Sequence, residues 1–294
     1  MEWTPGGTSP DIEDRRDDSG GGGGFGFGGG GFGGMHIGIG GAIILGVLSL
    51  VFHQNLFQVF SGAGPAPVTA NHSPRNVELD QKEGREVQFV SFVLDDVQKN
   101  WDRILPEQRN IEYHHAKMVL YRDAYPSACG TAQQAIGPFY CPGDEKVYLD
   151  LGFFHELSTR FGAPGEFAQA YVIAHEIGHH VQKLTGVEGR ARQLQQRRPD
   201  EANPISVRLE LQADCYAGVW ANSTEQRGIV HDADIEAALR AASAVGDDTL
   251  QRAGQGYVNP DSFTHGSAAQ RMRWFKAGLA QGRMADCNTF RQMD

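Results

Sequence analysis

Basic residues are in short supply in this chain of 294 residues. It has 26 lysines and arginines against 36 aspartates and glutamates, which gives a formal net charge of −10. No basic patch with interleaved aromatic residues occurs anywhere along it. Because the phosphate backbone repels a protein of this charge, nucleic acid is excluded as a partner.

Cysteine is also scarce, with four in the whole chain: Cys129, Cys141, Cys215 and Cys287. None belongs to a C-x-x-C pair, the spacing that usually holds structural zinc, so cysteine is not expected to bind a metal here. An even number of cysteines instead favours disulfide bonds in an oxidising compartment, and the spacing alone leaves their pairing open.

Long apolar runs are absent with one exception in the first quarter of the chain. Residues 37–52 contain no charged residue, and we expect residues 35–53 to form a single transmembrane helix. A cleaved secretory signal is the alternative, but the nearest small-residue cleavage candidates lie well beyond the apolar run. Residues 1–34, rich in glycine, are expected to be a disordered tail, and residues 54–75 a linker.

Basic residues near the expected span predict its orientation. Arg15 and Arg16 precede it, whereas no lysine or arginine follows until Arg75. The amino terminus is therefore expected in the cytoplasm and residues 76–294 outside it, in the periplasm or the extracellular space, on a single-pass protein of the cell membrane. All four cysteines follow the span, which agrees with this orientation.

The most informative motif is His175-Glu176-Ile177-Gly178-His179. On a helix the two histidines, four residues apart, project from one face and can reach a single zinc ion. Glu176 is turned away from the ligand positions and is suited to take a proton from the attacking water. Pro164 and Gly165 open the predicted helix and Gly186 closes it, which makes a core helix with two incidental histidines the weaker interpretation. His180 points away from His179 and is expected to be a packing or surface residue.

A catalytic zinc needs a third protein ligand, and a second predicted helix, residues 206–221, offers two carboxylates. Glu210 and Asp214 are also four residues apart. We assign Glu210 to the metal and Asp214 to a hydrogen bond with the non-ligating nitrogen of a zinc histidine. The alternative is an ordinary solvated pair of acids.

Five stretches resemble the family of putative neutral zinc metallopeptidases, which are bacterial membrane-anchored proteins. They are Ala128-Cys129-Gly130, GPFYCPGDEKVYLD from Gly137, AYVIAHEIGHHVQ from Ala170, LELQADCYAGVW from Leu209 and SFTHGSAAQRMRWF from Ser262. The resemblance implies a gluzincin-type site with Glu210 as the third ligand of Zn²⁺. With the nearness of the cysteines along the chain, it also suggests the disulfides Cys129–Cys141 and Cys215–Cys287.

The domain from residue 76 is predicted to be an α+β, zincin-like metallopeptidase fold, mostly helical with a small sheet. Helices are expected at residues 87–104, 153–160, 206–221, 232–245 and 268–279, besides the metal helix. Short strands are expected at residues 118–121 and 147–149. Residues 146–150 are our candidate for the edge strand that pairs with an extended peptide, although that strand could equally be internal.

A donor is also needed for the negative charge that develops on the scissile carbonyl oxygen. His265, in the loop Thr264-His265-Gly266, is the candidate, with Arg271 nearby. The alternative is a simple helix-entry loop with solvated arginines. Tyr257 and His231 are weaker candidates for this role, and Asp247-Asp248 reads as a helix-end turn without a catalytic role.

These patterns together predict a membrane-anchored zinc metallopeptidase, an endopeptidase acting on peptide or protein substrates, with Glu176 as general base. Two other functions remain open. One is a non-catalytic zinc-containing envelope scaffold, which the presence of Glu176 disfavours because a structural site has no use for a base. The other is a zinc hydrolase that acts on amide bonds of cell-wall peptide.

Overall fold

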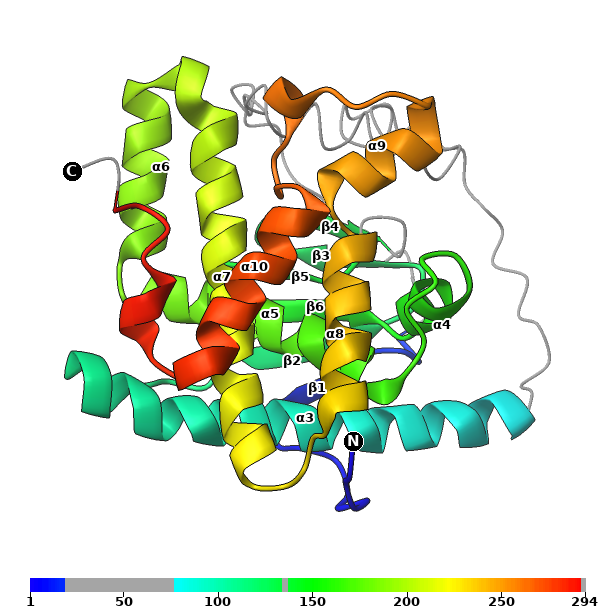
Figure 1. Cartoon of the computed structure of the whole chain (residues 1–294). Helices are drawn as coiled ribbons and strands as arrows, with labels where there is room; N and C mark the ends of the chain where they lie inside the picture. Colours follow the sequence, from blue (N-terminus) through cyan, green and yellow to red (C-terminus); the bar gives the residue numbers. More distant parts are fainter. Residues whose placement is uncertain (19–76, 134–136, 292–294) are drawn as a thin grey trace, which may run out of the picture.

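A computed structural model describes residues 1–18, 77–133 and 137–291 of the chain. Helices predominate in these ranges, and two small sheets complete an α+β fold (Figure 1), which confirms the expected class. The helices are α3 (Val77–Arg109), α4 (Gly152–Thr159), α5 (Glu166–Leu184), α6 (Val187–Arg197), α7 (Ala202–Gln226), α8 (Asp232–Ala244), α9 (Asp247–Gln255) and α10 (Ala268–Gln281). The strands are β1 (Ile12–Asp14), β2 (Lys117–Tyr121), β3 (Ala124–Ser127), β4 (Gly130–Gln133), β5 (Phe139–Cys141) and β6 (Lys146–Asp150).

No helix within the described ranges has the length and apolar character that crossing a bilayer requires. The expected span at residues 35–53 and the linker at residues 54–75 lie outside these ranges, as do residues 19–34 of the expected tail.

The larger sheet has the strand order β1-β2-β6-β5. Its first three strands are parallel, and β5 pairs with β6 in the antiparallel sense. The candidate edge strand, residues 146–150, is therefore internal, and that prediction is wrong. The free edge on that side belongs to β5, a strand of three residues that is too short to stand out in the sequence pattern.

Residues 1–18 are ordered, which corrects the expectation of a disordered tail from residue 1 to residue 34 for this part. β1 adds a parallel strand to the free side of β2, with Ile12 opposite Met118 and Asp14 opposite Leu120. Composition was misleading here because the glycine run begins only at residue 20. The charged residues before it include Asp11 and Glu13, which form ion pairs with lysines of the folded domain.

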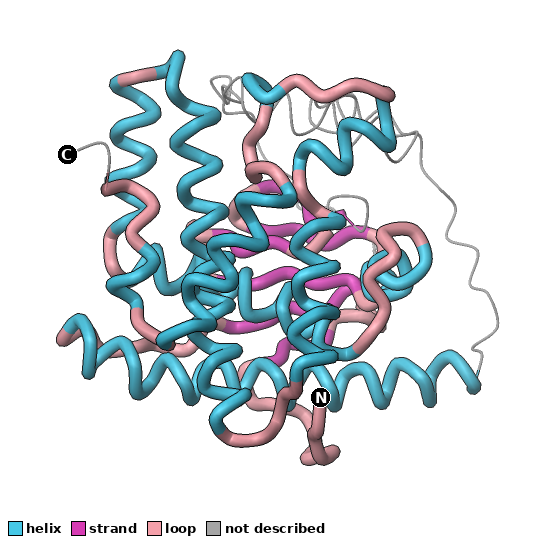
Figure 2. The backbone as a smooth tube through the Cα atoms, in the orientation of Figure 1, coloured by secondary structure: helices cyan, strands magenta, loops and turns pink. Residues whose placement is uncertain are grey.

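Helix α5 lies between the sheet and the helices α7 and α8, and it contacts β5 on one side and these two helices on the other (Figure 2). Gly178 allows the close approach of α7, because a Cβ atom at this position would lie 3.1 Å from both the Cα and the carbonyl oxygen of Ala213.

Helix α10 crosses α7 at a second glycine contact (Figure 1). A Cβ atom on Gly218 would overlap the carbonyl oxygen of Phe275, and one on Gly278 would overlap that of Cys215. The disulfide Cys215–Cys287 ties α7 to the segment that follows α10, and Cys129–Cys141 joins the β3–β4 hairpin to β5, as the resemblance implied. This crossing places Arg271, near the start of α10, in contact with Asp214 of α7.

Candidate metal centre

Helix α5 forms where the sequence predicts it, and the reason is local. It begins at Glu166 directly after Gly165, whose φ of 117° suits glycine and few other residues. It ends at Leu184, and Gly186 follows with a φ of 71° in the left-handed region. Within this frame His175 and His179 lie one turn apart on the same face, with their ring centres 4.9 Å apart.

Glu210 of α7 meets these two histidines. Its carboxylate oxygens lie 3.2 Å from His175 Nε2 and 3.5 Å from His179 Nε2. One ligand-type atom from each of the three residues falls within 4.8 Å of the others, and this is the group that could hold a metal ion in the described part of the chain. The structure therefore brings together the three residues that the sequence analysis selected as ligands.

The second nitrogen of each histidine has its own partner. His175 Nδ1 lies 2.8 Å from Asp214, and His179 Nδ1 lies 2.9 Å from the side-chain oxygen of Gln182. These contacts favour a proton on Nδ1 and leave each Nε2 free to bind a metal. Gln182 is fully buried and also donates to the carbonyl of Leu209, so it links the two ligand helices. The contact between Asp214 and His175 agrees with the prediction from the sequence, whereas Gln182 was not predicted.

Arg271 of α10 holds Asp214 in place. Its Nε and Nη2 donate to the two carboxylate oxygens at 2.8 and 2.9 Å. Asp214 is fully buried and Arg271 almost so. Tyr171 completes the cluster by donating its hydroxyl to Asp214. Arg271 was expected near the reacting carbonyl, but its guanidinium is committed to this buried ion pair.

The surrounding charges make the site attractive to a cation. Burial opposes protonation of His175, but Asp214 and Glu210 outweigh it and raise the pKa of His175 to about 10 in the metal-free protein. Burial also opposes ionisation of Glu210, yet the neighbouring histidines hold the pKa of Glu210 well below its usual range. The pocket therefore favours positive charge at the point where the three side chains converge.

Glu176 lies beside this point and is not one of the three converging residues. Burial raises the pKa of the Glu176 carboxyl, and the positive histidines and a hydrogen bond from the backbone N–H of Tyr140 act in the opposite direction. Tyr140 belongs to β5, so the edge strand runs next to Glu176. His180, on the far side, is buried between the hydroxyl of Tyr140 and the carbonyl of His114, which confirms a packing role.

His265 lies at the same cavity and is held by a residue that the sequence analysis set aside. One carboxylate oxygen of Asp247 accepts the backbone N–H groups of Thr264, His265 and Gly266 at 2.7, 2.7 and 3.0 Å. The other oxygen lies 3.2 Å from His265 Nδ1. Asp247 is the first residue of α9, just after Gly246, and the local sequence could have marked this helix start but not the contact with His265.

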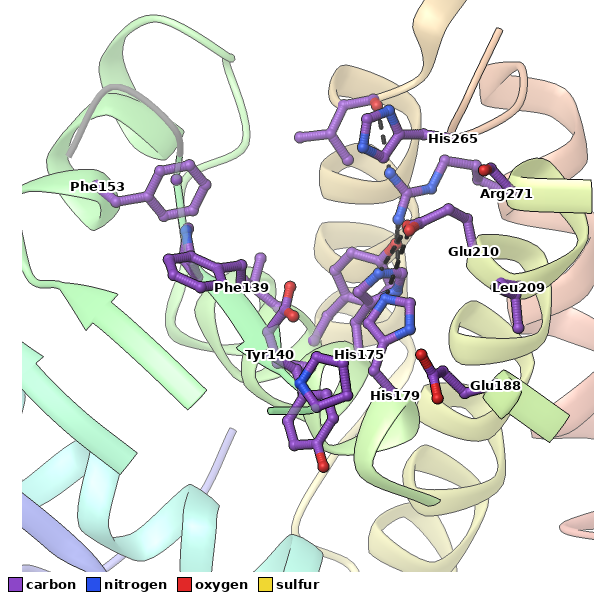
Figure 3. Close-up of a pocket in the computed structure, with 18 of the residues that line it drawn as sticks. Phe139, Tyr140, Phe153, His175, His179, Glu188, Leu209, Glu210, His265 and Arg271 are labelled. Atoms are coloured by element: carbon purple, nitrogen blue, oxygen red, sulfur yellow. Dashed lines mark hydrogen bonds and ion pairs between the residues drawn. The ribbon is translucent and has the colours of Figure 1, made fainter. Parts of the chain in front are cut away.

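One cavity of about 510 Å³ is lined by the three converging residues and by Glu176, His265 and Arg271. Figure 3 shows Phe139 and Phe153 on one side of it, with Glu210, Arg271 and His265 on the opposite side and Glu188 near His179. Two of the sequence candidates do not belong to it. Tyr257 is 64% exposed, and His231 precedes α8 with its ring near Glu2.

The comparisons with known proteins agree with this geometry. Residues 1–290 match the family described as putative neutral zinc metallopeptidase. The chain belongs to this family. An uncharacterised protein of Escherichia coli strain K12, YpfJ, is 44% identical to it over 295 aligned positions, which cover 99% of each chain.

A second relative, the uncharacterised protein Rv2575 of Mycobacterium tuberculosis strain H37Rv, is 46% identical over 205 positions, covering 66% of this chain and 67% of that protein. No solved structure matches. Both relatives are described as uncharacterised, so support for the chemistry comes from the site itself.

Proposed function

We propose that the protein is a zinc-dependent endopeptidase. The observation that carries the proposal is the convergence of His175, His179 and Glu210 beside Glu176, in a cavity bordered by the free edge of β5. Two imidazoles and one carboxylate are a ligand set that leaves the fourth position of zinc open. The set fits zinc, since both histidines keep Nε2 free and Nδ1 engaged. When bound, zinc would polarise the scissile carbonyl and lower the pKa of a water molecule.

Glu176 would act as the general base. Its buried carboxylate has a raised pKa, so it can take a proton from the attacking water and release it again to the leaving amine. The hydrogen bond from Tyr140 fixes the carboxylate next to the edge strand. A base in this position would meet the scissile bond of a peptide lying along that strand.

His265 would stabilise the negative charge that develops on the carbonyl oxygen. Partial burial opposes its protonation, but Asp247 and the nearby Glu210 raise the pKa of His265 above its ordinary value. With Nδ1 turned to Asp247, the imidazole presents its other N–H to the cavity. A donor held in this way before substrate binds needs no reorganisation during the reaction.

The substrate would bind as an extended chain. Among the described residues β5 has one neighbour in its sheet, β6. Apart from the Tyr140 N–H that Glu176 accepts, the groups on its other edge could form backbone hydrogen bonds with a peptide. Phe139, Phe153 and Val172 are among the apolar residues that line the cavity. They would favour an apolar side chain next to the scissile bond, because burying such a side chain is worth about 1.5–3 kcal/mol.

The test uses the full-length chain in detergent, because removal of residues 1–18 would delete a strand of the sheet. Purified protein is loaded with zinc and incubated with reduced, unfolded casein, and the cuts are located by mass spectrometry. We expect internal cuts that a chelator abolishes and that added zinc restores. Zinc-loaded protein that leaves casein intact would contradict the proposal and favour a scaffold or a hydrolase of cell-wall peptide.

Two variants separate the base from the ligands. Glu176→Gln should abolish cleavage while keeping about one zinc per chain, because the base is not a ligand. Glu166→Gln changes a partly exposed glutamate in the first turn of the same helix; it is the matched control and should cleave like wild type. Glu210→Ala should lose the zinc. A Glu176→Gln protein that lost its zinc instead would overturn the role given to Glu176.

A further inference from the structure

The first eighteen residues are part of the same folded body as the metal centre. β1 is hydrogen-bonded to β2 along its length, with Met118 donating to the carbonyl of Asp11 at 2.8 Å and Arg15 donating to that of Leu120 at 2.8 Å. The sheet continues through β6 to β5, which borders the cavity. Four strands therefore join the amino-terminal segment to the proposed active site.

Side-chain contacts also hold this segment on the domain. Asp11 is only 7% exposed, and its carboxylate contacts Lys117 at 2.7 Å, His115 at 2.6 Å and Gln98 at 2.9 Å. Glu13 pairs with Lys146 of β6 at 2.8 Å. A carboxylate as buried as that of Asp11 is unfavourable without partners, and all of these partners belong to the domain. The contacts can therefore form only when the amino-terminal segment lies against the domain.

The domain in turn needs the segment. Without β1, the parallel strand β2 would expose an unpaired edge, which proteins usually protect. Trp3 also covers Phe89 of α3, with ring centres 5.3 Å apart. The amino-terminal segment is therefore a structural strand of the domain and not an appendage.

We propose that residues 1–18 and the metal centre lie on the same side of any membrane that anchors the chain. A chain that crossed a bilayer once between residue 18 and residue 77 would place β1 and β2 on opposite sides of about 30 Å of hydrocarbon, and their pairing would be impossible. The single-pass orientation expected from the sequence, with a cytoplasmic amino terminus and an exported domain, is incompatible with this sheet. The proposal does not depend on peptidase activity.

The disulfides indicate the compartment as well. The disulfides Cys129–Cys141 and Cys215–Cys287 belong to the same folded body as β1. Disulfides of this kind persist in oxidising compartments. The amino terminus is therefore placed outside the cytoplasm together with the cavity.

Accessibility to a membrane-impermeant maleimide tests the arrangement. All four native cysteines are paired, so a single introduced cysteine gives a clean signal. Thr4→Cys reports on the amino-terminal segment and Glu225→Cys on the domain, at two exposed positions. We expect both to react equally in intact spheroplasts. Protection of Thr4→Cys until the membrane is permeabilised, with Glu225→Cys already labelled, would overturn the proposal, and protection of both would overturn the placement outside the cytoplasm.

Zero-length cross-linking tests the docking in the same membranes. A carbodiimide joins a carboxylate and an amine in contact as an amide, so Glu13 and Lys146 should appear as one cross-linked peptide after digestion. Lys146→Arg keeps the charge, removes the amine and should lose this peptide. Absence of the cross-link in the wild-type protein would show that β1 is not docked in the membrane-bound chain and would overturn the proposal.

Discussion

Replacing Arg271 with methionine should destabilise the protein strongly, although Arg271 is not a metal ligand. Its guanidinium forms two hydrogen bonds to the fully buried carboxylate of Asp214. The variant leaves that charge in the interior with only Tyr171 and His175 as partners. Removing one partner of a buried ion pair usually costs about 3–5 kcal/mol. We expect a loss of this size in the free energy of unfolding of the metal-free protein.

Urea unfolding followed by tryptophan fluorescence measures this loss, and Arg273→Met is the control. Arg273 lies two residues further on the same helix and is exposed, so its substitution should change the stability by less than about 0.5 kcal/mol. The double variant Asp214→Leu with Arg271→Met should be less destabilised than the sum of the two single variants, since no charge is then left buried.

The same variant should bind zinc more weakly. Without Arg271, Asp214 is held less rigidly and so orients His175 less well, and a weakened outer contact of this kind typically lowers metal affinity by about 10–100-fold. Competition with a chromogenic chelator measures it. Equal stability and equal zinc affinity of Arg271→Met and Arg273→Met would refute the reasoning.

Four other perturbations test separate parts of the structure. Gly178→Ala should force α5 and α7 apart, which should lower the free energy of unfolding by about 1–3 kcal/mol and weaken zinc binding. Gly189→Ala, at a position with open space around it, should change neither quantity. Asp247→Asn should lower turnover by up to about 100-fold at unchanged zinc content, because His265 loses the charged carboxylate beside its Nδ1 while most of the loop contacts remain. Unchanged turnover would mean that Asp247 has a purely structural role. Joint replacement of Cys215 and Cys287 by serine should cost about 4 kcal/mol in urea unfolding, more than the loss of Cys129–Cys141, since it opens the longer loop. The pKa of His115 is raised, because contacts with Asp102 and Asp11 outweigh the opposing effect of burial; Lys117 lies on the far side of Asp11. The charged imidazole should therefore stabilise the wild type below pH 6.5, and this stabilisation should disappear as the pH rises through the raised pKa and be absent from His115→Asn. A difference in unfolding free energy between the two proteins that does not change with pH would argue against this role of His115.

The parts of the site that depend on one helix were predictable. The spacing of His175 and His179 follows from the geometry of a single turn, and Gly165 and Gly186 mark where that helix begins and ends. The pairing of Glu210 with Asp214 follows in the same way on α7. These statements need no knowledge of the rest of the chain, because the physical cause lies within a few residues.

The parts that depend on contacts between distant segments were decided by the tertiary structure. Asp247 became a partner of His265 only because α9 and the loop before α10 fold against each other. β5 is recognisable as the edge only once β6 is paired on its other side with β2. The position of β1 is the clearest case, because residues with the composition of a flexible tail pair with a strand that follows more than a hundred residues later. Such pairing is set by the free edge and buried charges of the folded domain, which a local pattern does not contain.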